Sequence, residues 1–66
     1  MRVDVNGAAR EVDDGTTLSA MIETIAGSTR GSAVVVDGEV VPRSQWSGYA
    51  LRPGQAVELI TAVQGG

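Results

Sequence analysis

The chain has 66 residues, which is enough for one small domain with a thin hydrophobic core. It contains neither cysteine nor histidine, which excludes disulfides, thiolate nucleophiles, the commonest general base and the commonest zinc ligands. Its net charge of −3 argues against nucleic acid as a partner, because phosphates are bound by basic surfaces. We therefore expect a protein with no catalytic residue and no metal site of its own, rather than an enzyme.

The first twelve residues predict a β-hairpin. Residues 1–5 alternate apolar and polar side chains, which is typical of a strand with one buried face. Asn6-Gly7 favours a type I′ turn, because both central residues of that turn need a positive φ. A second strand, antiparallel to the first, is expected at about residues 8–12.

A short helix is expected next. Thr16 or Thr17 can cap its amino end with a side-chain hydroxyl, and Gly27 is suited to end it in the left-handed conformation. The apolar residues between them have the i, i+3, i+4, i+7 spacing of one helix face. They are Leu18, Met21, Ile22 and Ile25.

The second half of the chain predicts three more strands and an irregular connection. Residues 33–36 are a continuous, largely β-branched run, as expected of a central strand covered on both faces. A turn at Asp37-Gly38 leads to a short strand at 39–41, which Pro42 ends.

The connection at 43–49 is expected to be irregular, with one helical turn around 44–46. Trp46 is interpreted as a packing residue at one end of the core. The turn at 53–54 introduces the last strand, at 55–61.

These elements predict an α+β roll, in which one helix packs across one face of a mixed sheet of four to five strands. A single domain is expected over residues 1–66, with a flexible tail at about 62–66. If alternate residues of the last strand face the helix, Ile60 points away from it, and Val35 faces the same way from its own strand. Val35 and Ile60 are candidates for an apolar patch that docks partner enzymes, although scattered surface aliphatics are also common.

The terminal pair Gly65-Gly66 is open to two interpretations. It is either a loose end without function or a tail whose carboxylate is a substrate. Glycine has no Cβ, so such a tail fits a narrow channel and presents its carboxyl group without obstruction. The carboxylate must first be activated by another protein, for example as an acyl-adenylate. The chain has no lysine, so none of its side chains carries an amine that would consume the activated end.

Several segments together resemble the thiamine-biosynthesis sulfur carrier family, ThiS. Residues 40–46 contain Val-Pro-Arg-x-x-Trp, and residues 61–66 end in Ala-Val-Gln-Gly-Gly. The resemblance extends along the chain and includes the helix entry and three turns, at 15–18, 6–7, 37–38 and 53–54. It implies a ubiquitin-like β-grasp fold, with the last strand beside the first and parallel to it in the centre of the sheet.

The resemblance also implies a function. A ThiF-type adenylyltransferase would use ATP to adenylate Gly66, and sulfur from a cysteine desulfurase or another donor would displace AMP to give a thiocarboxylate. A ThiG-type thiazole synthase would then take this sulfur for the thiazole ring of thiamine. Gly65, Gln64 and Val63 would be recognised as part of the tail. The carrier itself would bind no cofactor, since ATP is consumed by its partner.

Three alternatives remain at this point. The small subunit of molybdopterin synthase shares the fold and the Gly-Gly end, but such carriers are usually longer and lack Ala-Val-Gln before the glycines. A ubiquitin-like protein modifier would form an amide with a target lysine, and a β-grasp interaction module would carry its Gly-Gly incidentally. The sequence has no run of roughly 18 apolar residues and no signal-peptide core, so we expect a cytoplasmic protein without membrane partners, monomeric when free.

Overall fold

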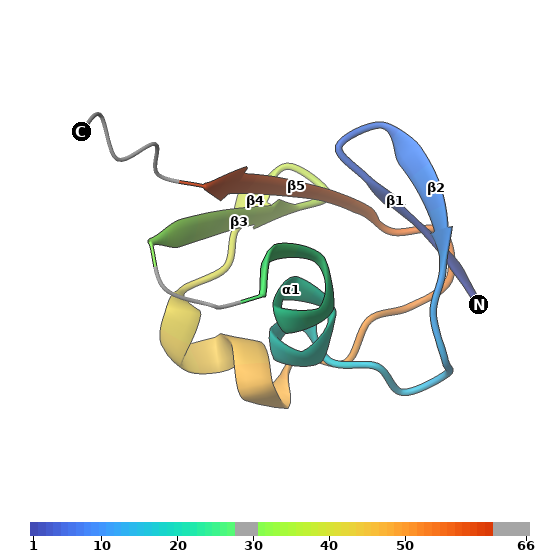
Figure 1. Cartoon of the computed structure of the whole chain (residues 1–66), viewed down its shortest axis with the longest axis horizontal. Coiled ribbons are helices and arrows are strands. Elements are labelled where there is room, and N and C mark those ends of the chain that lie inside the picture. Colours follow the sequence, from blue (N-terminus) through green and yellow to red (C-terminus); the bar gives the residue numbers. More distant parts are fainter. Residues whose placement is uncertain (28–30, 62–66) are drawn as a thin grey trace.

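The computed structural model describes residues 1–27 and 31–61. Within these ranges the chain forms five strands, one α-helix and one 3-10 helix (Figure 1). In chain order they are β1 (Arg2–Val5), β2 (Ala8–Glu11), α1 (Leu18–Ala26), β3 (Ser32–Val36), β4 (Glu39–Val40), η1 (Arg43–Gly48) and β5 (Ala56–Thr61).

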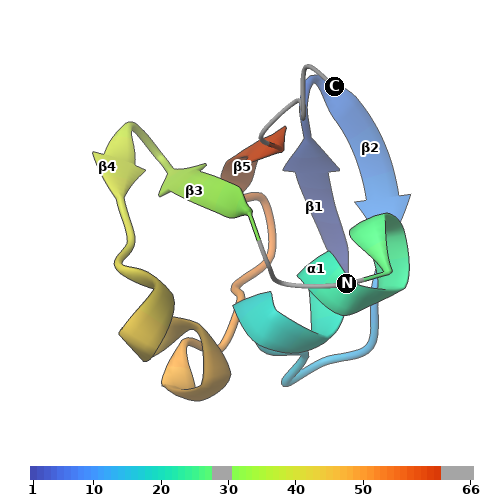
Figure 2. The same cartoon turned by 60° about the vertical axis from the view of Figure 1, so that its left-hand side comes forward.

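The five described strands form one mixed sheet in the order β2-β1-β5-β3-β4. Two antiparallel hairpins, β1–β2 and β3–β4, lie at opposite sides of the sheet, and β5 lies between them (Figure 2). β5 is parallel to β1 and antiparallel to β3. α1 and η1 pack together below the sheet in the view of Figure 1. The predicted α+β roll is confirmed, and so is the place of the last strand beside the first.

Both hairpins turn at residues that adopt the left-handed conformation. Asn6 and Asp37 have φ values of 51° and 50°, and Gly7 and Gly38 follow with 83° and 85°. Asn and Asp tolerate a positive φ better than other residues with a side chain. The hairpins therefore form where the sequence predicts them.

Thr17 caps the amino end of α1. Its Oγ1 accepts a hydrogen bond from the backbone N–H of Ala20 at 3.1 Å, whereas the Thr16 hydroxyl donates to the carbonyl oxygen of Asp13 at 2.6 Å. Gly27 ends the helix with a φ of 77°, and its N–H donates to the carbonyl oxygen of Glu23. The choice that the sequence left open between the two threonines is thus settled.

The core lies between α1 and the sheet and is wholly apolar. Its buried residues within the described ranges are Val3, Val5, Leu18, Met21, Ile22, Val34, Val36, Val41, Trp46, Leu51, Val57 and Leu59. Ile25, the last residue of the predicted helix stripe, packs partly buried against this core.

The expectation that the strand at 33–36 is covered on both faces is wrong. Val34 and Val36 are buried, but Ala33 is exposed and Val35 is only half-buried. α1 and η1 lie on the same side of the sheet, so neither of the described helices covers the other face of β3 (Figure 1). The β-branched run indicates strand propensity here, but it does not indicate that both faces of the strand are buried.

The segment after Pro42 is more regular than predicted. η1 extends over Arg43–Gly48, where only one turn around residues 44–46 was expected. Trp46 lies in this helix with 2% of its surface exposed, and its Nε1–H donates to the carbonyl oxygen of Val41 at 2.8 Å. The interpretation of Trp46 as a packing residue is confirmed.

Replacing Trp46 with Phe is expected to lower the free energy of unfolding by about 1–3 kcal/mol, because the buried carbonyl of Val41 loses its donor. Tyr49→Phe is a matched control that removes a weaker, part-buried contact, the 3.3 Å hydrogen bond from Gln55 Nε2 to the Tyr49 hydroxyl. Urea unfolding followed by circular dichroism measures both, since Trp46 is the only tryptophan and its fluorescence is lost. Equal losses of stability in Trp46→Phe and Tyr49→Phe would mean that the hydrogen bond from Trp46 to Val41 contributes no more than the weaker contact of Tyr49.

Candidate functional site

The predicted reaction site, Gly66, lies outside the described residues, as do Gly65, Gln64 and Val63. The structure describes the strand that leads to them. β5 runs between β1 and β3 and is described as far as Thr61. The part of the site that the structure shows is therefore the carboxyl-terminal half of β5 and the sheet surface around it.

The face of the sheet that is turned away from α1 carries a small apolar cluster. Val35 lies opposite Val40 on β4 and opposite Glu58 on β5, and Ile60 lies opposite Ala33. Directly opposed residues of antiparallel strands point to the same face. Val35 and Ile60 therefore share one face, as the alternation in the sequence predicts. We call Val35, Val40 and Ile60 the outer patch.

The outer patch is accessible, and it contains one residue that the sequence did not single out. Val40 is 73% exposed and Ile60 is 53% exposed, while Val35 is half-buried. Val40 and Val41 are adjacent in the chain and point in opposite directions, with Val41 only 7% exposed. Alternation requires one of these two valines to face outward but does not determine which, and the pairing of Val40 with Val35 decides it.

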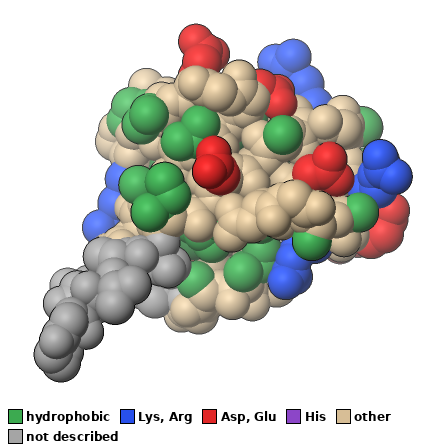
Figure 3. All heavy atoms as spheres, turned by 90° about the horizontal axis from the view of Figure 1, so that it is seen from above, with side chains coloured by type: hydrophobic (Ala, Val, Ile, Leu, Met, Phe, Trp, Pro, Cys, Tyr) green, Lys and Arg blue, Asp and Glu red, His purple; other side chains and the backbone are tan. Residues whose placement is uncertain are grey.

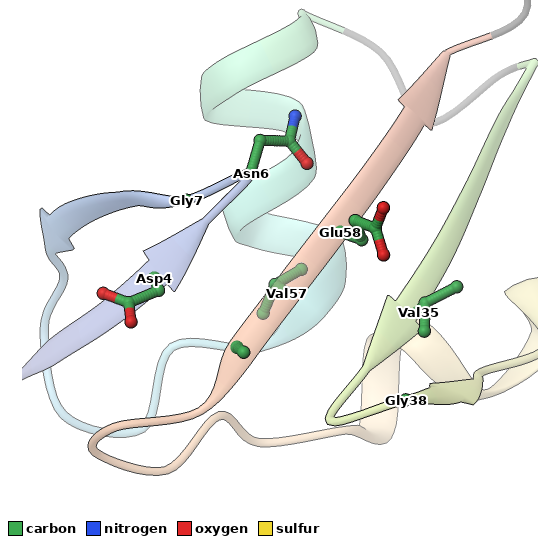
Figure 4. A pocket seen from close by; sticks show the side chains of 8 residues that line it. Asp4, Asn6, Gly7, Val35, Gly38, Val57 and Glu58 are labelled. Atoms are coloured by element: carbon green, nitrogen blue, oxygen red, sulfur yellow. The ribbon is translucent and has the colours of Figure 1, made fainter.

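A shallow acidic hollow lies next to the outer patch. It has a volume of about 460 Å³, and its lining includes Asp4, Val35, Ala56 and Glu58 (Figure 4). Ala56 lies opposite Asp4 in the β1–β5 pairing and has only a methyl group, which leaves space between its larger neighbours. Figure 3, which views the molecule from above, shows apolar and acidic side chains side by side. Such a surface suits a partner that presents apolar side chains and a basic group.

Two turn residues hold β5 through their side chains. Asn6 Oδ1 accepts from the backbone N–H of Leu59 at 2.8 Å, and Asn6 Nδ2 donates to the carbonyl oxygen of Leu59 at 3.3 Å. At the start of β5, Asp37 Oδ1 accepts from the N–H of Ala56 at 3.0 Å. The sequence predicted both residues as turn formers only. It contains no local signal for a contact between residues 53 positions apart.

The described part of the chain contains neither a metal-binding cluster nor a membrane-spanning helix. No group of three or more His, Cys, Asp or Glu side chains is arranged to hold a metal ion. No helix within the described ranges is long and apolar enough to cross a membrane.

Comparison with known proteins identifies the family. The model of the ThiS family matches residues 3–66, which is nearly the whole chain. The chain belongs to the ThiS family. It is 26% identical over 66 residues to the sulfur carrier protein ThiS of Escherichia coli (strain K12), and the match covers both chains completely.

Solved structures of the family confirm the fold. The crystal structure of the thiamine biosynthesis protein ThiS from Geobacter metallireducens has a TM-score of 0.81 at 25% identity, with both chains covered in full. A solution NMR structure of a thiamine biosynthesis protein from the same organism has a TM-score of 0.80 at 25% identity. That match covers all of this chain and 88% of the other. The fold is the ubiquitin-like β-grasp of the ThiS family.

Proposed function

We propose that this protein carries sulfur for thiazole formation in thiamine biosynthesis, as a thiocarboxylate on Gly66. One observation carries the proposal: the match to the ThiS family model continues to residue 66 and so includes the terminal Gly65-Gly66. The full-length similarity to a sulfur carrier protein from Escherichia coli gives further support. This match favours a functional role for the Gly-Gly end over an incidental loose end.

The proposed cycle starts with activation of the Gly66 carboxylate. A ThiF-type adenylyltransferase joins a carboxylate oxygen to the α-phosphorus of ATP, and pyrophosphate leaves. A sulfur donor such as the persulfide of a cysteine desulfurase then attacks the acyl carbon, and AMP leaves with the oxygen. Reduction of the remaining sulfur–sulfur bond by two thiol groups, which become a disulfide, frees the donor cysteine and leaves the thiocarboxylate. A ThiG-type thiazole synthase takes up the sulfur, and the carboxylate is regenerated.

In this cycle the folded domain provides recognition, and the enzymes provide the catalytic groups. The outer patch is the proposed docking site for the adenylyltransferase, because Ile60 lies on the strand that leads to the tail. The six residues that follow Ile60, up to Gly66, span at most about 22 Å when fully extended. A partner that holds the outer patch therefore has the reactive carboxylate within this reach. Asp4 and Glu58 at the adjacent hollow favour a partner surface with a basic group.

The proposal is tested by intact mass measurement. With a ThiF-type adenylyltransferase, ATP and a sulfur donor, the mass is expected to rise by the difference between one sulfur and one oxygen atom. Addition of a ThiG-type thiazole synthase with its other substrates is expected to return the mass to its original value. Sulfur transfer to a molybdopterin synthase large subunit instead would assign the carrier to that pathway. An amide bond to a lysine would indicate a protein modifier, and no modification at all would indicate an interaction module.

A further inference from the structure

The two edges of β5 are paired over different lengths. On the β3 side the pairing continues from Val57 to Thr61. On the β1 side it includes only Ala56 and Val57, because β1 ends at Val5 and the chain turns away. The carboxyl-terminal half of β5, which leads to the tail, therefore lies beyond the last residue of β1.

The side chain of Asn6 takes the place of a further residue of β1. The backbone N–H of Asn6 donates to the carbonyl oxygen of Val57 at 2.9 Å. Its side-chain amide then bonds to both the N–H and the carbonyl oxygen of Leu59, at 2.8 and 3.3 Å. A carboxamide has the same donor and acceptor groups as a peptide unit, so it adds one rung to the ladder. Figure 4 shows Asn6 at the end of β1, alongside β5.

Asp37 makes a comparable contact at the other end of β5. Its backbone N–H donates to the carbonyl oxygen of Ala56 at 2.8 Å, and its Oδ1 accepts from the N–H of Ala56 at 3.0 Å. Asn6 and Asp37 both occupy the first left-handed position of a two-residue turn. Asp37 thus provides an internal control: it is in the same kind of turn and binds the same strand, but far from the tail.

We propose that Asn6 is a positioning residue that holds the β1 edge of the carboxyl-terminal half of β5, from which the tail continues, and so directs the tail into the adenylyltransferase. The inference rests on the proposed function. Leu59 is the last core residue of the described chain and, through Asn6, is held on its β1 edge as well as by its pairing with Val34. Ile60 of the outer patch follows at once. For a partner docked on the outer patch, the tail therefore begins at a fixed position relative to the docking surface, which favours correct alignment of the Gly66 carboxylate with ATP.

Three variants test the role of Asn6. Asn6→Gly keeps the positive φ of the turn and removes both side-chain hydrogen bonds. Asn6→Asp keeps the size and the acceptor but places a carboxylate oxygen against the carbonyl of Leu59. Asp37→Gly is the matched control, since it removes the hydrogen bond to Ala56 from the same kind of turn. All three are compared with wild type at a temperature where circular dichroism shows each of them fully folded.

Amide hydrogen exchange and steady-state adenylation are the two measurements. Asn6→Gly is expected to speed exchange at the Leu59 amide by about tenfold, since its acceptor is lost. It is also expected to lower kcat for adenylation by about 5–10-fold with KM within about twofold of wild type, because alignment of the tail and not docking is impaired. Asn6→Asp is also expected to lower kcat relative to wild type. Asp37→Gly is expected to leave Leu59 exchange and kcat within about twofold of wild type.

The possible results separate this inference from the proposed function. If the wild-type protein is adenylated and Asn6→Gly matches its kcat, the positioning role is overturned. Equal losses of kcat in Asn6→Gly and Asp37→Gly would also overturn it, because they would indicate general loosening of β5. If the wild-type protein is not adenylated, the proposed function fails and the positioning role fails with it.

Discussion

Deletion of Gly66 is expected to abolish the exchange of oxygen for sulfur and to leave the free energy of unfolding within about 0.5 kcal/mol of wild type. The described core extends from Val3 to Leu59, so the deletion removes none of its side chains. The shortened tail ends at Gly65, and its carboxylate falls one residue short, which is about 3.5 Å in an extended chain. Misplacement by about 1 Å is enough to cost on the order of a hundredfold in rate.

Gly66→Ala separates the length of the tail from its shape. This variant keeps the position of the terminal carboxylate but adds a Cβ next to it. If the tail enters a narrow channel, kcat/KM for adenylation is expected to fall by about 10–100-fold rather than to zero. Intact mass time courses and pyrophosphate release measure both variants.

Persistence of the mass gain in the deletion variant would place the modification elsewhere in the chain. Unimpaired adenylation of Gly66→Ala would mean that the tail is not held in a narrow channel. Urea unfolding of both variants is the control, because a loss of structure would lower the rate for an unrelated reason.

Much of the fold follows from local features of the sequence. Asn6-Gly7 and Asp37-Gly38 form the predicted turns because these residues tolerate a positive φ in any context. The helix begins at its threonine cap and ends at Gly27 for equally local reasons. The sequence predicts only one turn of η1, because the position of this helix depends on the burial of Trp46 against distant parts of the chain and not on a helical period.

The candidate site was accessible to sequence reasoning only in part. Strand alternation placed Val35 and Ile60 on one face, whereas Val40 joins them through its pairing with Val35, which alternation does not predict. The hydrogen bonds between Asn6 and Leu59 depend on β1 and β5 lying side by side. That pairing was predicted from the family resemblance and not from a pattern in the chain. The proposed role of Gly66 likewise rests on the resemblance and is supported by the family match.

The second large effect is expected at the outer patch. Ile60→Asp is expected to raise KM for the adenylyltransferase by about 30–100-fold, with kcat within about threefold of wild type. Ile60 is 53% exposed in the free protein, so a partner can bury it, and burial of a carboxylate in its place would cost the free energy of removing its charge from water. Ser44→Asp is the charge-matched control, because Ser44 is exposed on η1, which packs with α1 below the sheet.

Ile60→Thr separates the loss of apolar surface from the added charge. Threonine keeps a β-branched side chain, so the strand propensity of β5 is preserved. If apolar contact drives docking, this variant is expected to raise KM by about 5–10-fold without a change in salt dependence. A KM as high as that of the Asp variant would mean that a close steric fit at Ile60, and not burial of apolar area, determines binding.

Substitution in the outer patch and substitution of Asn6 are expected to change different kinetic constants. Ile60→Asp weakens docking and raises KM, whereas Asn6→Gly leaves docking intact and lowers kcat. Ile60 and Leu59 are adjacent on β5, so a general distortion of this strand would change both constants in both variants. A KM equal to that of wild type in the Ile60→Asp protein would mean that the outer patch is not part of the docking site. A rise in KM for one variant and a fall in kcat for the other therefore distinguish a docking surface from a positioning residue, although the residues involved are neighbours in the sheet.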